Sequence, residues 1–578
     1  MQDNQLQKAT RSRGRALFGL CLWGLLRAAD VDASGTELEP GMHGYGLTVM
    51  EGTRIDTFGV QILGWERNGA LPGRDRILVR LSGLGLEESG IVLGMSGSPV
   101  YVDDRLIGAV AYGWSFANEP VGLLTPIEEM LEVMDRDLSG DSPPADVAAP
   151  TTEPGWRRLG SPLWVSGAGP ETMRLLTDLL SPIGLQPLAA SGGTEQSDTV
   201  APLMPGSAVG IQLVGGDLSI TGIGTVTHVD GNRLVAFAHD LVGSGAIDVP
   251  FTTANIHGIL SNQSSSFKLG SATAVVGAAR QDRYSGVAGV THERARTLPM
   301  AVDVQTATMT NQFSFDLARH RFYTTSLAQV ALMRSMESAA KALGDASVSV
   351  TLEVELDDGR SLSWQRVYTG LNAPISAALE VGRPLRALVQ SGFEDLEVMR
   401  IRTQVSVDER IHTARVDGAR LDRATVEAGS VAHVTVHLTP FQASPHDVVI
   451  PIGIPADAVG TVRVQIGSGR AAAEWEQSRW PQTAPGNSDE LLQRLRQPAR
   501  DDELVVELVT EAPGLAVGGR ELPTPPPSVH RLLTETHASG FVQPLALKVL
   551  ARQRRATDYV LQGEHVLTVN ITAKGTHR

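Results

Sequence analysis

Short runs in which apolar and polar residues alternate recur along most of the chain, and turn-forming residues separate them. Alternation with a period of two is typical of half-buried β-strands, because successive side chains point to opposite faces of a sheet. The 60 glycines supply many of the turns that such strands need. This pattern predicts a mainly β protein.

The chain has 578 residues, which is too long for a single hydrophobic core. At roughly 100 to 200 residues per domain, we expect about three to five domains. Composition shifts and turn-rich stretches divide the sequence into the following regions. These are a signal segment at 1–29, β-rich halves at 41–136 and 158–325 joined by a linker at 137–157, a helix and hairpin region at 326–395, a β-sandwich-like domain at 396–477, and a Pro-rich segment with C-terminal strands at 478–578.

The N-terminus has the layout of a signal peptide. Basic residues up to Arg15 precede a short apolar run, Ala16 to Leu26, and Arg27-Ala28-Ala29-Asp30 follow it. The run is shorter than the ~20 residues that a membrane-spanning helix needs. We therefore expect an exported protein, periplasmic or secreted, whose only alternative membrane element is an uncleaved N-terminal anchor.

Charge and composition argue against several function classes. The formal net charge of −15 disfavours binding to a phosphate backbone, so no nucleic acid partner is expected. The single cysteine, Cys21, lies within the apolar run, so the mature chain would have no thiol for disulfides, catalysis or metal binding. No zinc, calcium or phosphate-loop motif is present, and we expect neither a metal nor another cofactor.

The sharpest motif is Gly94-Met95-Ser96-Gly97-Ser98-Pro99, which leads into a predicted hairpin. A serine hydroxyl is a poor nucleophile, and it needs a tight turn whose N–H groups face the developing oxyanion. Glycines on both sides of Ser96 permit such a turn. By itself, however, the hexapeptide is also compatible with a plain glycine-rich turn between strands.

The order of these residues resembles the nucleophile loop of chymotrypsin-like proteases, in which Gly94 and Ser96 would supply the oxyanion-hole amides. The flanking sequence resembles the sporulation stage IV protein B (SpoIVB) serine peptidase family, and a downstream strand and turn match the part of that family that carries its catalytic histidine, here His239. His239 also follows an apolar strand, as a residue opening onto a cleft would. The matching stretches are Glu51 to Phe58, Gly90 to Pro99, Leu106 to Val110, Gly222 to Thr227, Ala236 to His239 and, more weakly, Ser265 to Gly270 and Gly286 to Gly289.

The resemblance implies a chymotrypsin-like double β-barrel, but its two halves are in permuted order. In the family the histidine half comes first, whereas here Ser96 precedes His239. Two compact barrels that meet at a cleft tolerate such a change, because only the linkers must differ. Pairing of Ser96 with the histidine of a second molecule would satisfy the sequence equally well.

The sequence differs from the family in a second way, at the acid that orients the histidine. The position of the family's aspartate falls on or beside Ser82. Asp248, nine residues after His239, is our first candidate to replace it, and Asp240 and Asp75 are weaker ones. A dyad in which a backbone carbonyl orients the imidazole is a further possibility.

These observations predict a serine endopeptidase with Ser96 as nucleophile and His239 as general base. The resemblance implies limited proteolysis of one protein or peptide partner in the cell envelope, or self-cleavage. The main alternative is a noncatalytic binding or scaffold protein that retains the fold. An esterase with the same nucleophile is a third reading, but the long alternating helices of an α/β-hydrolase are missing.

Overall fold

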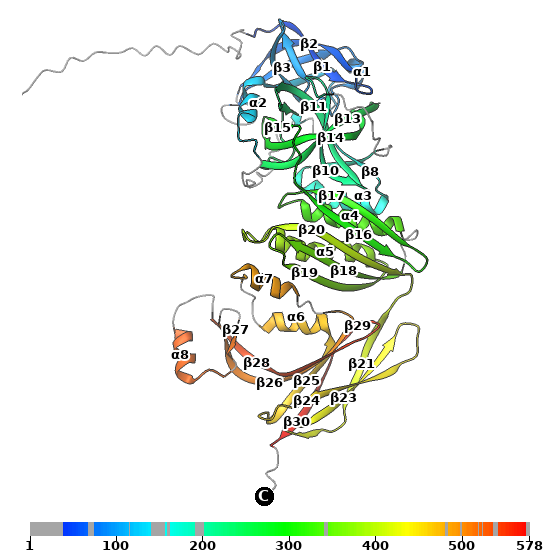
Figure 1. The fold of residues 1–578 in the computed structure, drawn as a ribbon, viewed down its shortest axis with the longest axis vertical. Helices are drawn as coiled ribbons and strands as arrows, with labels where there is room; N and C mark the ends of the chain where they lie inside the picture. Colours follow the sequence, from blue (N-terminus) through cyan, green and yellow to red (C-terminus); the bar gives the residue numbers. More distant parts are fainter. Residues whose placement is uncertain are drawn as a thin grey trace, which may run out of the picture.

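The computed structural model describes residues 38–67, 74–114, 116–139, 156–158, 162–190, 202–339, 345–479, 484–496, 500–517, 520–522, 524–535 and 542–573. The fold is mainly β, as the alternation predicted, and is consistent with the expected chymotrypsin-like architecture. In Figure 1 the chain runs from two β-barrels, through a mixed layer, to a C-terminal β-sandwich.

The first barrel, called the serine barrel here, is a closed ring of six strands. Closure leaves no long unpaired edge. Its interior is filled by alternate residues, such as Phe58, Val60 and Ile62, each at most 2% exposed. In ring order the strands are β1 (His43–Val49), β2 (Ile55–Glu66), β3 (Arg76–Ser82), β6 (Val121–Pro126), β5 (Arg105–Trp114) and β4 (Pro99–Val102), with the short helix α1 (Leu86–Ser89) before β4 and α2 (Ile127–Met134) after β6.

The second barrel, called the histidine barrel, is also a ring of six paired strands. In ring order these are β10 (Ala208–Gly216), β13 (Gly245–Leu260), β14 (Phe267–Arg283), β15 (Gly286–Thr291), β12 (Arg233–Ala236) and β11 (Ser219–Asp230). Outside the ring lie β8 (Pro162–Ser166) and β9 (Gln186–Ala189), together with α3 (Pro170–Leu180) and the 3-10 turn η1 (Ser181–Ile183).

The two barrels share buried side chains, so they form one packed unit. One apolar cluster combines Ala109 and Leu123 of the serine barrel with Val235, Ala238 and Ala288 of the histidine barrel. Isolated β-bridges, Gly52 with Ile256 and Leu93 with Phe267, add backbone links. Residues at the boundary between the barrels are therefore held in place by contacts with both barrels.

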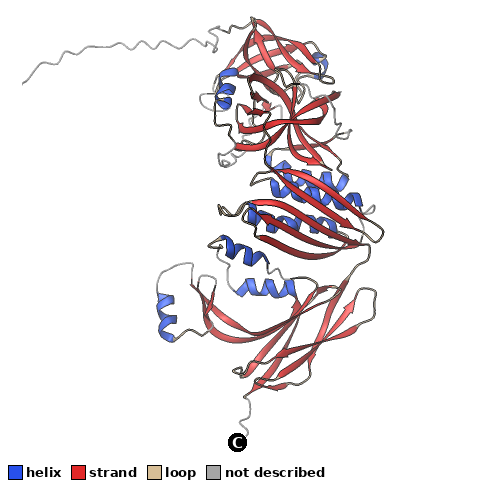
Figure 2. Ribbon diagram, in the orientation of Figure 1, coloured by secondary structure: helices blue, strands red, loops and turns tan. Residues whose placement is uncertain are grey.

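A mixed layer continues the sheet of the histidine barrel through pairing of β10 with β17. The strands β16 (Thr297–Gln305), β17 (Thr310–Ala318), β20 (Val398–Asp408), β18 (Ala346–Leu356) and β19 (Ser361–Gly370) pack against α4 (Thr324–Ala339) and α5 (Ala373–Val389). Figure 2 shows these helices against the strands of this layer. A helix and a hairpin were predicted here, but α5 was not. β20, which we assigned to the sandwich, pairs in this layer between β16 and β18.

The C-terminal sandwich comprises two sheets around a separate apolar core. It spans 413–572 rather than the predicted 396–477, because β26 of the expected Pro-rich segment is central in the second sheet. One sheet contains β21 (Thr413–Leu421), β23 (Val431–Pro440), β24 (His446–Gly453) and β29 (Val560–Gln562). The other contains β22 (Thr425–Glu427), β25 (Gly460–Ser468), β26 (Glu503–Val517), β27 (Arg520–Leu522), β28 (Val542–Ala556) and β30 (His565–Thr572), and α6 (Gly469–Arg479), α7 (Ser488–Arg496) and α8 (Pro527–Glu535) accompany it.

Two predictions about the periphery have different outcomes. The signal segment 1–29 lies outside the described residues. Of the predicted linker 137–157, the described part ends in a short strand, β7 (Trp156–Arg158), which pairs with β5. Within the described ranges, none of the helices has the length and apolar character that a membrane crossing requires.

Candidate active site

The predicted nucleophile loop joins α1 to β4 in the serine barrel. The Gly97 N–H donates to the Val110 carbonyl on β5 (2.8 Å), and the Met95 side chain is buried in the barrel core. Gly94 and Gly97 have φ angles of +95° and +90°, a region that glycine adopts without steric cost. The glycines flanking Ser96 therefore have the turn-forming role that the sequence predicted.

Gly97 is also a point of close contact between the two barrels. A Cβ atom at this position would lie 2.1 Å from the Thr225 carbonyl oxygen and 2.4 Å from the Phe237 nitrogen. Real Cβ atoms do not approach backbone this closely, so only glycine fits here. The loop that carries Ser96 thus lies directly on the strand that leads to His239.

His239 follows β12 on an unusual turn. Phe237 and Ala238, the two residues before it, have φ angles of 71° and 54°, which are uncommon outside glycine. Such a conformation is costly and persists only where surrounding contacts impose it. One of those contacts comes from the serine barrel, where the Thr125 hydroxyl donates to the Ala238 carbonyl (2.7 Å).

Thr225 on β11 connects the nucleophile loop to this turn. Its N–H donates to the Ser96 carbonyl (2.8 Å), and its hydroxyl donates to the Gly94 carbonyl (3.0 Å). Its own carbonyl accepts the Phe237 N–H (3.2 Å). Ser96 and His239, about 140 positions apart in sequence, therefore lie on adjoining segments of the same chain, and no second molecule is needed to bring those segments together.

The pair is enclosed in this conformation. Ser96 is 0% exposed and His239 is 1% exposed. The Ser96 hydroxyl has no hydrogen-bond partner among the described residues. The backbone N–H groups of Gly94 and Ser96 likewise donate to no acceptor in the described ranges, which leaves both amides available to an oxyanion.

The imidazole of His239 is held by backbone. Its Nδ1 lies 2.7 Å from the Asp240 carbonyl oxygen. When Nδ1 is the donor in this contact, Nε2 is the ring nitrogen that can accept a proton. Asp240 was one of the weaker acid candidates, and here its backbone, not its carboxylate, makes this contact.

Asp248, our first candidate for the orienting acid, has other partners. One carboxylate oxygen bonds to the Arg280 guanidinium (2.6 Å), and the other accepts from the backbone and side chain of Arg296 (3.1 and 3.2 Å). Both oxygens therefore bond to arginines, and the orienting role of Asp248 stays a prediction. Asp75, the remaining candidate, forms an ion pair with Arg67 (2.6 Å).

A buried carboxylate that the sequence reasoning missed organises the loop after His239. Asp282 on β14 is 1% exposed and accepts the N–H groups of Leu241, Val242 and Ser244 at 2.7, 3.0 and 3.2 Å. Burial, followed by the nearby charge of Asp240, raises the pKa of Asp282 to about 6. Asp282 thus fixes the backbone that supplies the carbonyl held by His239.

A buried lysine, also missed, lies behind the nucleophile loop. The stem of Lys268 packs against Gly94, where a Cβ atom would meet its Cδ at 3.2 Å. Its amine donates to the Thr48 hydroxyl (2.8 Å), which also accepts from Ser98 (3.0 Å). Complete burial lowers the pKa of Lys268 to about 7, because the charged form is poorly solvated there.

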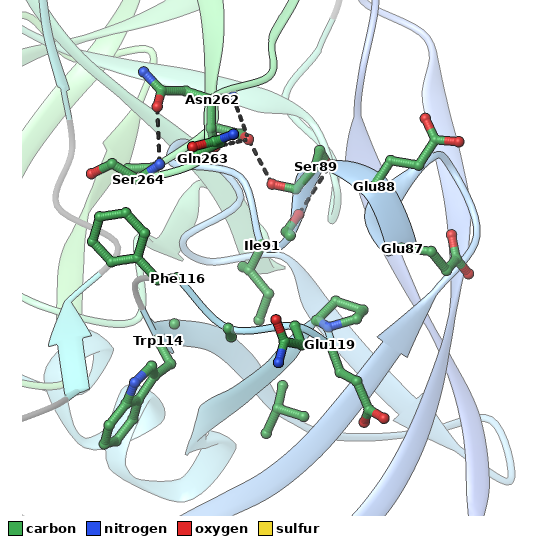
Figure 3. Close-up of a pocket in the computed structure, with 18 of the residues that line it drawn as sticks. Glu87, Glu88, Ser89, Ile91, Trp114, Phe116, Glu119, Asn262, Gln263 and Ser264 are labelled. Atoms are coloured by element: carbon green, nitrogen blue, oxygen red, sulfur yellow. Dashed lines mark hydrogen bonds between the residues drawn. The ribbon is translucent and has the colours of Figure 1, made fainter.

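A cavity of about 430 Å³ opens beside the residues that lead into Gly94. Figure 3 shows Trp114 and Phe116 along one side of it and Glu87 and Glu88 on the other. None of the described residues that line it is a lysine or arginine. Its described lining comes from residues 87–91 and 93, residues 113, 114 and 116–121, and residues 262–266.

The charge of this cavity is negative. Glu87 accepts the Gly83 N–H (2.7 Å), and this bond holds the pKa of Glu87 below its usual range. Glu119, which lines the cavity, accepts a hydrogen bond from Arg80, which lies outside the lining (2.8 Å). In the part of the chain that the structure describes, no group of three or more His, Cys, Asp or Glu side chains could hold a metal ion.

Comparison with known proteins places one part of this architecture in a family. Residues 33–131 match the family described as SpoIVB peptidase S55. No curated protein and no solved structure matches the chain. The matched residues include all six strands of the serine barrel and the loop with Ser96, whereas the histidine barrel lies outside them. Residues 33–131 are therefore similar to the SpoIVB peptidase S55 family, in agreement with the resemblance seen in the sequence.

Proposed function

We propose that the chain is an exported serine endopeptidase that performs limited or self proteolysis of a protein partner in the cell envelope. Ser96 attacks the peptide carbonyl, and His239 accepts the hydroxyl proton and later protonates the leaving amine. The amides of Gly94 and Ser96 bind the oxyanion of the tetrahedral intermediate.

One observation carries this proposal. The loop that contains Ser96 and the turn that contains His239 are joined through Thr225, which bonds to both. The two segments come from separate six-stranded barrels, the arrangement that the family resemblance implied. The match of residues 33–131 to a peptidase family supports the same function independently.

The proposal includes a dyad in which the Asp240 carbonyl orients the imidazole of His239. With Nδ1 bonded to the Asp240 carbonyl, the Nε2 atom of a neutral His239 is the acceptor for the serine proton. A carbonyl stabilises the protonated imidazole less than a carboxylate does, so the enzyme is expected to be slower than one with a complete triad. Slow turnover suits a protease that cuts one partner.

Catalysis requires the site to open. The hydroxyl of Ser96 is buried and makes no hydrogen bond to a described residue. We therefore expect the hydrogen bond between Ser96 and His239 to form when the site opens to admit substrate. Catalytic hydrogen bonds often tighten only in the substrate complex. The export and envelope parts of the proposal rest on the N-terminal basic and apolar pattern.

Labelling with a fluorophosphonate tests the proposal. We expect the intact chain to be modified at Ser96, and we expect Ser96→Ala and His239→Ala to abolish the modification. His228→Ala, in the same barrel, is the matched control and should label like the wild type. A folded wild-type chain that neither labels nor cleaves itself or a partner would contradict the peptidase function.

The alternative function is a noncatalytic envelope scaffold. The complete burial of Ser96, and the position of the family's aspartate on or beside Ser82, are what favour it. The same labelling experiment separates the two, because a scaffold would remain unmodified in every variant.

A further inference from the structure

The peptide group that carries the Gly94 N–H is held by β14 of the other barrel. Its carbonyl belongs to Leu93 and accepts the backbone N–H of Lys268 (3.0 Å), and the Leu93 N–H donates to the Ser266 carbonyl (2.8 Å). In a planar trans peptide the C=O and the N–H point in opposite directions. Because the carbonyl is bonded to Lys268, the Gly94 N–H points away from the backbone of Lys268.

The side chain of Lys268 makes a second contact with the same peptide. A Cβ atom at Gly94 would meet the Cδ, Cγ and Cβ atoms of Lys268 at 3.2, 3.3 and 3.4 Å, so the stem lies against the bare Cα of the glycine. Glycine has no side chain to restrict its own backbone rotation. The lysine stem therefore supplies a restriction that Gly94 itself lacks.

The amine of Lys268 begins a chain of hydroxyl groups that returns to Gly94. It donates to the Thr48 hydroxyl (2.8 Å), which also accepts from the Ser98 hydroxyl (3.0 Å). The Ser98 oxygen lies 3.5 Å from that of Thr225, and the Thr225 hydroxyl donates to the Gly94 carbonyl (3.0 Å). The carbonyls on both sides of the Gly94 N–H are thus connected to Lys268, one directly and one through this chain.

A lysine is a costly residue for this place. Lys268 is 0% exposed, and in the described part of the chain its amine bonds to a hydroxyl and to no carboxylate. Burial of an amine without a counter-charge is unfavourable, and an apolar side chain of the same length would fill the space without that cost. Ionisable groups in such surroundings are concentrated at functional sites.

We propose, on the basis of the peptidase function above, that Lys268 is a positioning residue for the oxyanion hole, which holds the Leu93–Gly94 peptide in the direction in which the Gly94 N–H can bind the oxyanion. Lys268 itself touches neither the substrate nor the reacting atoms. Its effect falls on the transition state, because a misdirected amide stabilises the oxyanion poorly even when the substrate is bound normally.

The first test separates the rate of fluorophosphonate labelling from the binding of the reagent. In Lys268→Ala we expect the limiting rate of Ser96 labelling to fall about ten- to thirtyfold and the half-saturating concentration to stay unchanged. Lys268→Met, which restores the stem, should come within about threefold of the wild-type rate. Leu213→Ala on β10 is the control for a buried truncation, because Leu213 belongs to the core of the histidine barrel and not to that of the loop.

The outcome for Lys268→Ala distinguishes the two proposals. A wild-type limiting rate in Lys268→Ala would overturn the positioning role and leave the peptidase function intact. A loss that Leu213→Ala shares, or that appears in the half-saturating concentration alone, would overturn it as well.

The second test concerns the hydroxyl chain, and it also serves if Lys268→Ala does not fold. Lys268→Met and Thr48→Val remove neighbouring members of the chain and keep the volume of the side chains. We expect each to lower the limiting rate by about threefold, and the double variant to lower it no further, because both changes break the same connection to Gly94. Additive losses, or no loss in either variant, would overturn the role of the amine.

The third test needs no activity. Hydrogen exchange of the backbone amides in residues 91–98 reports how firmly the nucleophile loop is held. We expect this exchange to be at least about fivefold faster in Lys268→Ala than in the wild type, and unchanged in Leu213→Ala. Equal exchange in Lys268→Ala and the wild type would overturn the positioning role, whereas a wild-type chain that is never labelled would contradict the peptidase function.

Discussion

The two barrels hold their halves of the candidate site by opposite means. In the serine barrel, glycines at 94 and 97 adopt the left-handed backbone conformation without strain. In the histidine barrel, the non-glycine residues Phe237 and Ala238 are forced into the same region just before His239. The serine is thus presented by a local sequence motif, whereas the histidine is presented by contacts made elsewhere in the fold.

The same contrast holds for buried charge. The nucleophile loop contains no charged residue, but the histidine barrel contributes Lys268 behind Gly94 and Asp282 beneath the loop after His239. Buried ionisable groups are costly and are retained where they are hydrogen-bonded. The difference teaches that the histidine barrel contributes buried charged groups next to both halves of the site.

The largest effect is expected from adding a side chain at Gly97, where the two barrels are in contact. Gly97→Ala would place a methyl group 2.1 Å from the Thr225 carbonyl oxygen in a residue with φ +90°. Backbone cannot yield as a side chain can, so we expect a loss of about 3 kcal/mol or more in the free energy of unfolding. Denaturant unfolding measures the stability, and fluorophosphonate labelling of Ser96 should be lost.

Gly184→Ala is the control for this experiment. Gly184 has a similar φ of +86°, but nothing lies within 4 Å of its added Cβ. Gly184→Ala therefore has the conformational cost without the steric clash, and we expect it to lower the free energy of unfolding by about 1 kcal/mol. Equal losses in the two variants would mean that the barrels do not meet at Gly97.

The second effect tests whether the histidine depends on its buried acid. Asp282→Asn removes an acceptor from one of three backbone N–H groups and should destabilise the protein by about 2 kcal/mol. The folded pKa of Asp282, about 6, is raised above the ordinary value of 3.8. Its contribution to stability is therefore fully present below pH 3.8 and is lost as the pH rises through 6.

The measurement is the difference in unfolding free energy between the wild type and Asp282→Asn from pH 4 to pH 7. We expect this difference to shrink as the pH rises. Asp248→Asn is a suitable comparison, because it loses ion pairs with Arg280 and Arg296 but lies outside the loop after His239. If the two variants reduced Ser96 labelling equally, Asp282 would have no special role in positioning His239.

These residues also show how far sequence reasoning reaches. Ser96 and His239 were singled out because turn glycines and the end of an apolar strand are local signals. Lys268 and Asp282 gave no such signal. Each is a charged residue in an alternating strand, and only the pairing of β14 shows that its side chain is directed inward.

Long-range pairing explains the other misses. β26 lies in the stretch that we predicted to be a Pro-rich segment, yet a register shift between Glu511 and Gly514 lets the strand continue beside β28. β20 alternates like a sandwich strand, but it is inserted in parallel against β16. Periodicity predicts that a strand exists, but it does not identify the strand's neighbour.

A third effect concerns the lysine that the histidine barrel places behind the serine loop. The folded pKa of Lys268, about 7, is below the ordinary value of 10.5. The unfolded chain therefore binds more protons between pH 7 and 10.5, and stability rises with pH across that window. From pH 7 to pH 9, we expect this rise to be about 2 kcal/mol in the wild type and absent in Lys268→Met.

Thermal or denaturant unfolding at the two pH values gives this difference. Lys548→Met is the control, because Lys548 lies on β28 in the sandwich, away from the barrels. It should keep the rise. A Lys268→Met variant that also kept the rise would show that the buried amine is already charged at pH 7, and the contrast in buried charge between the barrels would then need another explanation.

The smallest effect tests strain directly. Ala238→Gly removes the cost of a left-handed alanine, so we expect the unfolding free energy to rise by about 0.5–1 kcal/mol, in contrast to the usual penalty for glycine. The added backbone freedom should at the same time slow Ser96 labelling, because His239 is held less firmly. Ala288 is a buried alanine of the same apolar cluster, on the extended strand β15. We expect Ala288→Gly to lower the unfolding free energy by about 1 kcal/mol and to leave Ser96 labelling unchanged. If Ala238→Gly lost as much stability as Ala288→Gly, the turn before His239 would be unstrained, and the histidine would be presented as locally as the serine.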